Sequence, residues 1–399
     1  MHIFIRLLAV VIIGMAGLSG CDDGGALNLS EISLENKELG GGPIVIGLLT
    51  SVINHDSLQR GIQLALQEIN ERPTFQNQPM LVQVYLKPNF PNNEMGIVQK
   101  IAKHHNTIAV INGLTSRYTS ATDRILMTSN ILHILVANTS TSVSQASPLS
   151  FRIISNDRIA SKKIVANLER RWRNMAVINE RSEMFVSQAK TFTESAAESN
   201  IHISHSISYF FWEKDIRQLL WSLRESANKN QNLLDAIYIA CNVSDSVSII
   251  NQIRSMNIRV PIVSSVELDD IAQLQAAGTA ANGVVMATYF NPDASDPAVK
   301  DFVKQFKAKY PNNQPDIWAA RAYVALSMLA TSIESAKTVN AWEVASELLL
   351  PEKWYGATGA IIFGIGGDVQ KQAPMYLKQY CNGQFHFLAE DQPIPLCPP

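Results

Sequence analysis

The chain is poor in the features that mark most catalysts and most nucleic-acid-binding proteins. Among 399 residues only four are cysteine, and charged residues make up 17% with a net charge of −2. No basic patch stands out, which argues against nucleic acid as a partner. The sequence holds no G-x-S-x-G elbow, H-E-x-x-H helix or phosphate-binding loop, and it indicates no metal or cofactor site. We therefore expect a binding protein rather than an enzyme.

Long apolar runs are also scarce, apart from one segment near the N-terminus. Residues 7–18 form an apolar core after His2 and Arg6. Its length of about 12 residues is short against the roughly 20 that span a bilayer. Small residues then lead to Cys21. This order predicts an export signal over residues 1–20, with a transmembrane anchor as the alternative.

The residues around Cys21 indicate how the exported body is held. The Leu-Ser-Gly-Cys sequence that ends at Cys21 resembles the lipobox of bacterial lipoproteins. That resemblance implies cleavage before Cys21 and attachment of acyl chains such as palmitate through its sulfur. Residues 21–42 are rich in glycine and acidic residues, which predicts a flexible tether. We expect a periplasmic protein anchored in a membrane, and Asp22 resembles a signal that favours the inner membrane.

The other cysteines divide into a pair and a single residue. Cys381 and Cys397 both lie in the proline-rich C-terminal tail. Export would place them where disulfides persist, so a bridge between them is expected, with two free thiols as the alternative. Cys241 follows an apolar run and is expected to be a small buried residue.

Between the tether and the tail, apolar strands alternate with amphipathic helices. Continuous apolar strands separated by such helices indicate parallel sheets that are covered on both faces. The expected strands form a first set at 44–49, 80–85, 108–111, 131–137 and 150–154, and a second set at 175–178, 201–209, 236–240, 261–264 and 283–288. Two sets of similar layout predict an α/β fold with two Rossmann-like lobes.

The last third of the chain departs from this alternation. Helices are expected at 297–310, 316–335 and 341–349, and closing strands at 355–363, 375–380 and 384–388. We expect the helices to pack on the first lobe and the strands on the second, so that the chain crosses three times, near Ser155, Tyr289 and Trp354. The expected domains are 43–155 with 290–353 for lobe 1, and 156–289 with 354–399 for lobe 2.

Three crossings and this order of elements resemble the type I periplasmic-binding fold. Three stretches carry the resemblance, at 46–70, at 110–116 (Val-Ile-Asn-Gly-Leu-Thr-Ser) and at 355–368, where Gly367-Asp368 closes the segment. They are similar to leucine/isoleucine/valine-binding proteins, the solute receptors of branched-chain amino-acid ABC transporters. The resemblance implies capture of a small ligand by hinge closure, for delivery to an ABC permease. A sensor subunit with a signalling partner and a structural lipoprotein are the alternatives.

Two hydroxyl-rich turns are the first candidates for ligand contact. Thr115 and Ser116 follow one expected strand, and Asn138 and Thr139 follow the next. Ligands of α/β sheets bind beyond the carboxyl ends of the strands, and a helix start after Ser116 favours an anion. The resemblance assigns Ser116 and Thr139 to the α-carboxylate of an amino acid. The alternative is that these residues only cap a helix or form a turn.

The ammonium group of an amino acid requires a carboxylate. Glu267 and Asp269 lie within about one residue of the family's acidic position, and Glu267 is preferred. The alternative is an acid that stabilises a helix start. Met184 and Asn242 fall where the family has aromatic residues lining the second lobe. These differences make leucine, isoleucine or valine less favoured as the ligand, and we expect an amino acid, an amide or a related carboxylate.

Overall fold

The computed structural model describes residues 42–51, 54–87, 94–104, 106–114, 119–141, 147–228, 234–350, 354–364, 366–371, 375–389 and 397. The expected signal, Cys21 and residues 22–41 of the expected tether lie outside these residues. So do Thr115 and Ser116. The described chain has the α/β fold that the sequence predicts, with two large sheets.

The first sheet contains five parallel strands in the order β2-β1-β3-β4-β5. These strands are β1 (Ile44–Ser51), β2 (Met80–Lys87), β3 (Thr107–Asn112), β4 (Leu132–Leu135) and β5 (Ser150–Arg152). They correspond to the first expected set. Helices cover both faces, which explains why nearly every residue of β1 and β3 is buried.

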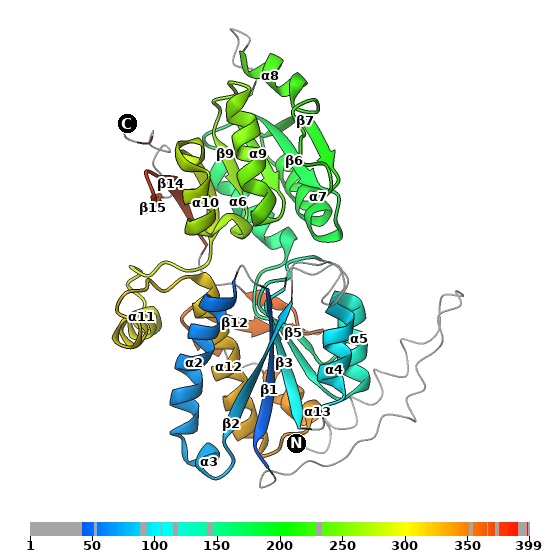
Figure 1. Cartoon of the computed structure of the whole chain (residues 1–399), viewed down its shortest axis with the longest axis vertical. Helices are drawn as coiled ribbons and strands as arrows, with labels where there is room; N and C mark the ends of the chain where they lie inside the picture. The colour runs from blue at the N-terminus through cyan, green and yellow to red at the C-terminus, as the bar shows by residue number, and fades with distance from the viewer. Residues whose placement is uncertain are drawn as a thin grey trace, which may run out of the picture. The chain divides into compact units, whose positions relative to one another are not determined.

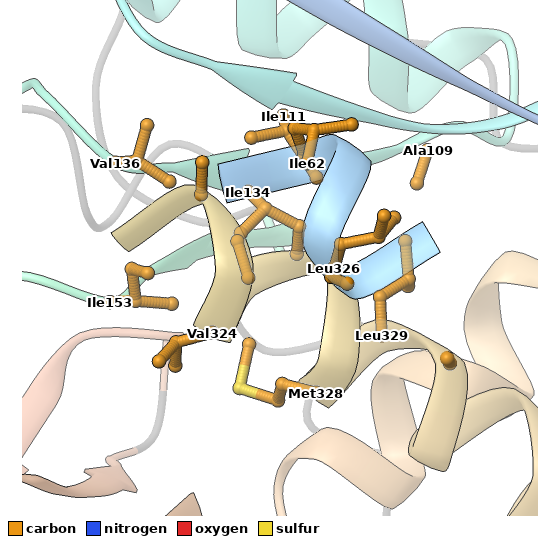
Figure 2. Packing of buried hydrophobic residues seen from close by; sticks show 14 of the residues in the cluster. Ile62, Ala109, Ile111, Ile134, Val136, Ile153, Val324, Leu326, Met328 and Leu329 are labelled. Carbon is orange, nitrogen blue, oxygen red and sulfur yellow. The ribbon is translucent and has the colours of Figure 1, made fainter. Parts of the chain in front are cut away.

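Alternate residues of β1 enter two separate cores. Ile46 and Leu48 belong to the larger core, which also contains residues of α2 (His55–Asn70) and α12 (Ile317–Ala336). Leu49 belongs to a smaller core with residues of the helices on the other face, α4 (Glu94–Ala102) and α5 (Thr119–Thr128) (Figure 1). Figure 2 shows side chains of α12 directed at those of β3, β4 and the segment after β5. Three further helices accompany this sheet: α3 (Pro73–Gln76), α11 (Pro297–Lys309) and α13 (Ala341–Leu348).

Helices α2 and α12 approach so closely that one position admits only glycine. A Cβ atom built on Gly61 would lie 2.1 Å from the carbonyl oxygen of Ala319. Glycine normally weakens a helix interior by about 1 kcal/mol relative to alanine. Here it allows the contact that brings α12, from the last third of the chain, onto the first sheet.

The second sheet contains seven strands in the order β15-β14-β10-β9-β8-β6-β7. The parallel strands are β6 (Asn174–Glu180), β7 (His202–Tyr209), β8 (Ala236–Ala240), β9 (Ile262–Ser264) and β10 (Val284–Thr288). The last two, β14 (Tyr376–Cys381) and β15 (Gln384–Phe387), are antiparallel. The strands expected at the C-terminus therefore extend the second sheet.

Both faces of the second sheet are also covered by helices. Residues of α6 (Asp157–Leu168) and α7 (Glu183–Ala197) form one core, in which Phe192 stacks on Tyr238 with ring centroids 3.9 Å apart. Residues of α8 (Trp221–Asn228), α9 (Val243–Ser255) and α10 (Ile271–Ala276) form the other core.

A third, small sheet differs from the sequence expectation. The segment expected as one strand over 355–363 is a hairpin of β11 (Trp354–Gly356) and β12 (Gly359–Phe363), and β13 (Val369–Lys371) pairs with β12. Gly359 makes the turn with a φ of 84°, a conformation that favours glycine. The Phe363 ring lies 5.2 Å from that of Phe151 in the larger core of the first sheet. This packing differs from the expected assignment of residues 354–371 to lobe 2.

The three cysteines that the structure describes are arranged as the sequence predicts. A disulfide joins Cys381, at the end of β14, to Cys397. Cys241 is a buried free thiol next to the hydroxyl of Tyr209, and burial raises the pKa of this thiol. Such a thiol is inert as a nucleophile, because the reactive form is the thiolate.

Candidate ligand-binding cleft

A cleft of about 1470 Å³ lies where the strands of both sheets end. Its walls on the first sheet include Ser51 at the end of β1, Asn54 after it, Lys87 at the end of β2, and Gly113 and Leu114 after β3. Its walls on the second sheet include Glu180 at the end of β6, Ser182 after it, Asn242 after β8, Glu267 after β9 and Phe290 after β10. Carboxyl ends of strands are the usual place for a ligand in α/β folds. Sites for small molecules occupy about 300–1,000 Å³, so this cleft has room for one.

Aromatic side chains supply much of the apolar wall. Phe185, Phe211, Phe290, Phe385 and Phe387 all line the cleft. Phe185 directly follows Met184, one of the positions where the family has an aromatic residue. Met184 and Asn242 also line the cleft, and neither has an aromatic ring. The other aromatic residues are missed because they come from loops and the C-terminal hairpin, at positions for which the resemblance gave no ligand contact.

Glu267 is the acid best placed to meet a cation in the cleft. It is 7% exposed and lies on a short turn of helix at Val266–Leu268. The Ser265 hydroxyl and the Gln188 amide donate hydrogen bonds to its carboxylate. Burial raises the pKa of Glu267, and these hydrogen bonds together with the charge of Arg321 oppose that rise. Among the described residues, no basic group lies within 4 Å of Glu267.

The neighbouring acid Asp269 has a cation of its own. Its carboxylate accepts a hydrogen bond of 2.5 Å from Lys378 Nζ, and both side chains are buried. Lys378 also lies over the ring of Phe385, 3.8 Å from the centroid. The charge of Asp269 is thus already compensated, whereas Glu267 has no close cation among the described residues.

Thr139 lies in a buried contact between the two sheets rather than on the cleft wall. It is 3% exposed, and its hydroxyl accepts a hydrogen bond of 3.2 Å from the Nε2 of Gln188, on α7. The Gln188 Oε1 in turn accepts a hydrogen bond from Ser265. Gln188 therefore links the two predicted ligand contacts, Thr139 and Glu267, and sequence reasoning missed it.

The other predicted turn residues have different surroundings. Asn138 donates to the hydroxyl of Thr119 at 2.7 Å and accepts from the backbone of Ser140 at 3.0 Å, which fixes the loop. Thr115 and Ser116 are not described. The turn that leads to them reaches the cleft wall at Gly113, whose carbonyl accepts a hydrogen bond of 2.7 Å from Asn54.

Asp157 adds a titratable group to the contact around Thr139. It is buried in the first turn of α6, and its backbone N–H donates to the carbonyl of Thr139 at 2.8 Å. Burial raises the pKa of Asp157 to about 7, although hydrogen bonds with Thr139 and Ser187 lower it in part. The charge at this contact therefore changes near neutral pH.

Residues 47–384 of the chain match the model of the periplasmic binding protein family. The chain belongs to this family. The matched segment begins in β1 and ends at the start of β15, so it includes both large sheets and the cleft. A periplasmic binding protein is a solute-binding protein, and this explains the position of the cleft.

Solved structures of periplasmic binding proteins have the same fold. An ABC transporter substrate-binding protein from Desulfitobacterium hafniense, in complex with Leu, is 22% identical with a TM-score of 0.74, and the match covers 87% of this chain and 100% of that one. A leucine-binding protein from Thermotoga maritima is 22% identical with a TM-score of 0.73, covering 87% and 98%. A solute-binding protein from R. palustris, in complex with benzoate, is 16% identical with a TM-score of 0.74, covering 87% and 96%.

None of the curated proteins matches this sequence. In the described parts of the chain, no helix has both the length and the apolar character needed to cross a bilayer. Those parts also contain no cluster of three side chains suited to a metal ion.

Proposed function

We propose that this periplasmic binding protein captures a small ligand that carries both a carboxylate and an ammonium group, and delivers it to an ABC permease. The observation that carries the proposal is Glu267, a buried acid on the cleft wall with no basic partner within 4 Å in the described chain. An amino acid would supply the missing cation. The hydroxyl of Thr139, together with Ser116, would meet its carboxylate, and the aromatic wall would receive its side chain.

Binding in this proposal proceeds by closure of the lobes over the cleft. Closure removes water from the ligand, and hydrogen bonds to its charged groups are stronger in the drier site. A ligand shifts the protein toward the closed form only to the extent that it binds that form better. For its carboxylate to reach Thr139, it must displace the Gln188 amide, which now holds the Thr139 hydroxyl.

The first prediction concerns ligand binding. We expect one amino acid in a panel to raise the melting temperature by several degrees and to be recovered unchanged after incubation. Glu267→Gln should weaken its binding at least about tenfold, because loss of a buried charge partner costs more than 1.4 kcal/mol. Thermal shift and calorimetric titration measure both effects. Glu343→Gln, at an exposed position of α13, is the matched control.

Benzoate distinguishes this proposal from capture of an aromatic carboxylate. Benzoate has no ammonium group, so its binding would not depend on the charge of Glu267. If benzoate binds and Glu267→Gln leaves that binding unchanged, while no amino acid binds, the ligand class proposed here is wrong.

We further propose that the protein is held at the periplasmic side of the inner membrane by lipid on Cys21. The support is the lipobox resemblance and the extracytoplasmic location that its family implies. Mass spectrometry of the membrane-extracted chain should show a diacylglyceryl group on Cys21 as its first residue. Cys21→Ser should move the protein to the soluble fraction. An unmodified Cys21 in a membrane-bound chain would contradict the proposal.

A further inference from the structure

A second, much smaller cavity lies among buried residues that the cleft does not use. Its volume is about 20 Å³, and it shares no lining residue with the cleft. Four polar residues contribute to its wall: Ser155, Tyr289, Arg321 and Thr358. The remaining wall is apolar and includes Ile153, Ile361 and Val369. A cavity of 10–15 Å³ holds one water-sized particle, so this one is limited to a single small occupant.

The guanidinium of Arg321 faces this cavity without a counter-charge. Arg321 is 1% exposed, and its Nη1 donates to the carbonyl of Val136 at 3.3 Å. Its Nη2 has no hydrogen-bond partner among the described residues. Nor does any carboxylate of those residues lie within 4 Å of it, although Glu267 and Asp269 attract its charge from farther away. A buried cation without a close partner carries a high energetic cost.

Aromatic rings compensate only part of that charge. The Arg321 guanidinium lies over the rings of Trp318 and Tyr289, at 5.4 and 5.9 Å from their centroids. Burial lowers the pKa of Arg321 to about 10, so the group remains protonated at neutral pH. A cation–π contact contributes about 2 kcal/mol when desolvated, less than a close anion would.

The other polar groups of the cavity are hydroxyls, which can all donate. The Thr358 Oγ1 is buried and has no partner among the described residues. The Tyr289 hydroxyl is near Ser155, a contact that lowers its pKa against the larger effect of burial. A guanidinium and hydroxyl donors within an apolar wall are suited to a monovalent anion. The small volume excludes phosphate and carboxylates.

We propose that this cavity binds one small monovalent anion of the size of chloride, held by Arg321, Thr358 and the Tyr289 hydroxyl. Ser155 belongs to the segment between β5 and α6, and Tyr289 to the segment that follows β10. Thr358 lies in the turn between β11 and β12. The anion would therefore connect two of the segments that run between the large sheets with α12 and with the small third sheet.

The test compares chloride with gluconate, which is too large for the cavity, at constant ionic strength. At ten times its dissociation constant, a bound anion increases the folding equilibrium constant elevenfold. This corresponds to a rise of about 2 °C or more in the melting temperature of the full chain. Thr358→Val, which keeps the side-chain shape, should reduce the rise, and Arg321→Met should abolish it. Crystals grown with sodium bromide should show an anomalous peak within hydrogen-bond distance of Arg321.

A matched control separates the anion from a general effect of losing a buried hydroxyl. Thr107, on β3, is also a buried threonine whose Oγ1 has no partner among the described residues, and it does not line the cavity. Thr107→Val should keep the full response to chloride. An equal response in Thr358→Val, or crystals in which the cavity holds only water at high bromide, would overturn the proposal. Thr358→Val keeps the test valid should Arg321→Met fail to fold.

Discussion

Asp368→Asn is expected to lower the free energy of unfolding by about 3 kcal/mol. Asp368 accepts two hydrogen bonds from Arg152, at 2.7 Å from Nε and 2.8 Å from Nη2. Arg152 is fully buried, whereas the Asp368 side chain is 24% exposed. Asparagine keeps the shape but leaves a buried guanidinium without its anion, a change that costs 3–5 kcal/mol in buried pairs. We choose the lower end because Asp368 is partly in contact with water.

Urea denaturation measures this loss as a lower midpoint with an unchanged slope. Asp215→Asn is the control, because Asp215 pairs with Arg217 on the surface, where both side chains are more than half exposed. Exposed pairs contribute little to stability, so the control should unfold at the wild-type midpoint. Equal midpoints for the two variants would contradict the prediction, because the pair of Arg152 and Asp368 would then contribute no more to stability than an exposed pair.

The second large effect is a dependence of stability on pH through Asp157. Burial raises its pKa from 3.8 to about 7 in the folded state. The nearby charge of Glu267 also raises this pKa, while that of Arg152 lowers it. The folded protein then keeps a proton that the unfolded chain releases near pH 4. The contribution of Asp157 to stability is therefore highest below about pH 4 and falls as the pH rises to 7, by up to about 4 kcal/mol at 1.4 kcal/mol per unit.

Asp157→Asn should remove this slope and make the protein more stable than the wild type at pH 8. Urea midpoints measured between pH 4 and pH 8 give the two profiles, and their difference isolates Asp157 from the other buried acids. Glu343→Gln should follow the wild-type profile. Parallel profiles for the wild type and Asp157→Asn would contradict the prediction.

The two large sheets could be predicted because their central strands are continuous apolar runs. In β1 and β3 nearly every residue is buried, and a run of this kind needs no knowledge of distant contacts. The β11–β12 hairpin was not predicted, because residues 355–363 are apolar enough for one strand. Its turn depends on the φ of a single residue, Gly359. The position of α12 beside α2 depends on Gly61 and Ala319, whose proximity no local pattern reveals.

Sequence reasoning reached residues of the cleft only near strand ends. Glu267, Met184 and Asn242 line the cleft, and their contact with a ligand stays a prediction. Gln188 was missed, since a glutamine on an amphipathic helix has the pattern of a solvent-exposed residue. The ion-pair partner of Asp368 could not be predicted from the sequence either. Arg152 lies 216 positions earlier in the chain, and only the folded backbone brings its charge to that aspartate.

The bridge to Cys397 also matters for how binding can be observed. It fixes Cys397 to the end of β14, the strand that carries Lys378 to the wall of the cleft. A fluorophore or purification tag attached shortly after Cys397 would therefore begin close to that strand. Labels for solute titrations are better placed elsewhere, for example on the exposed face of α13, so that the reporter does not compete with the solute.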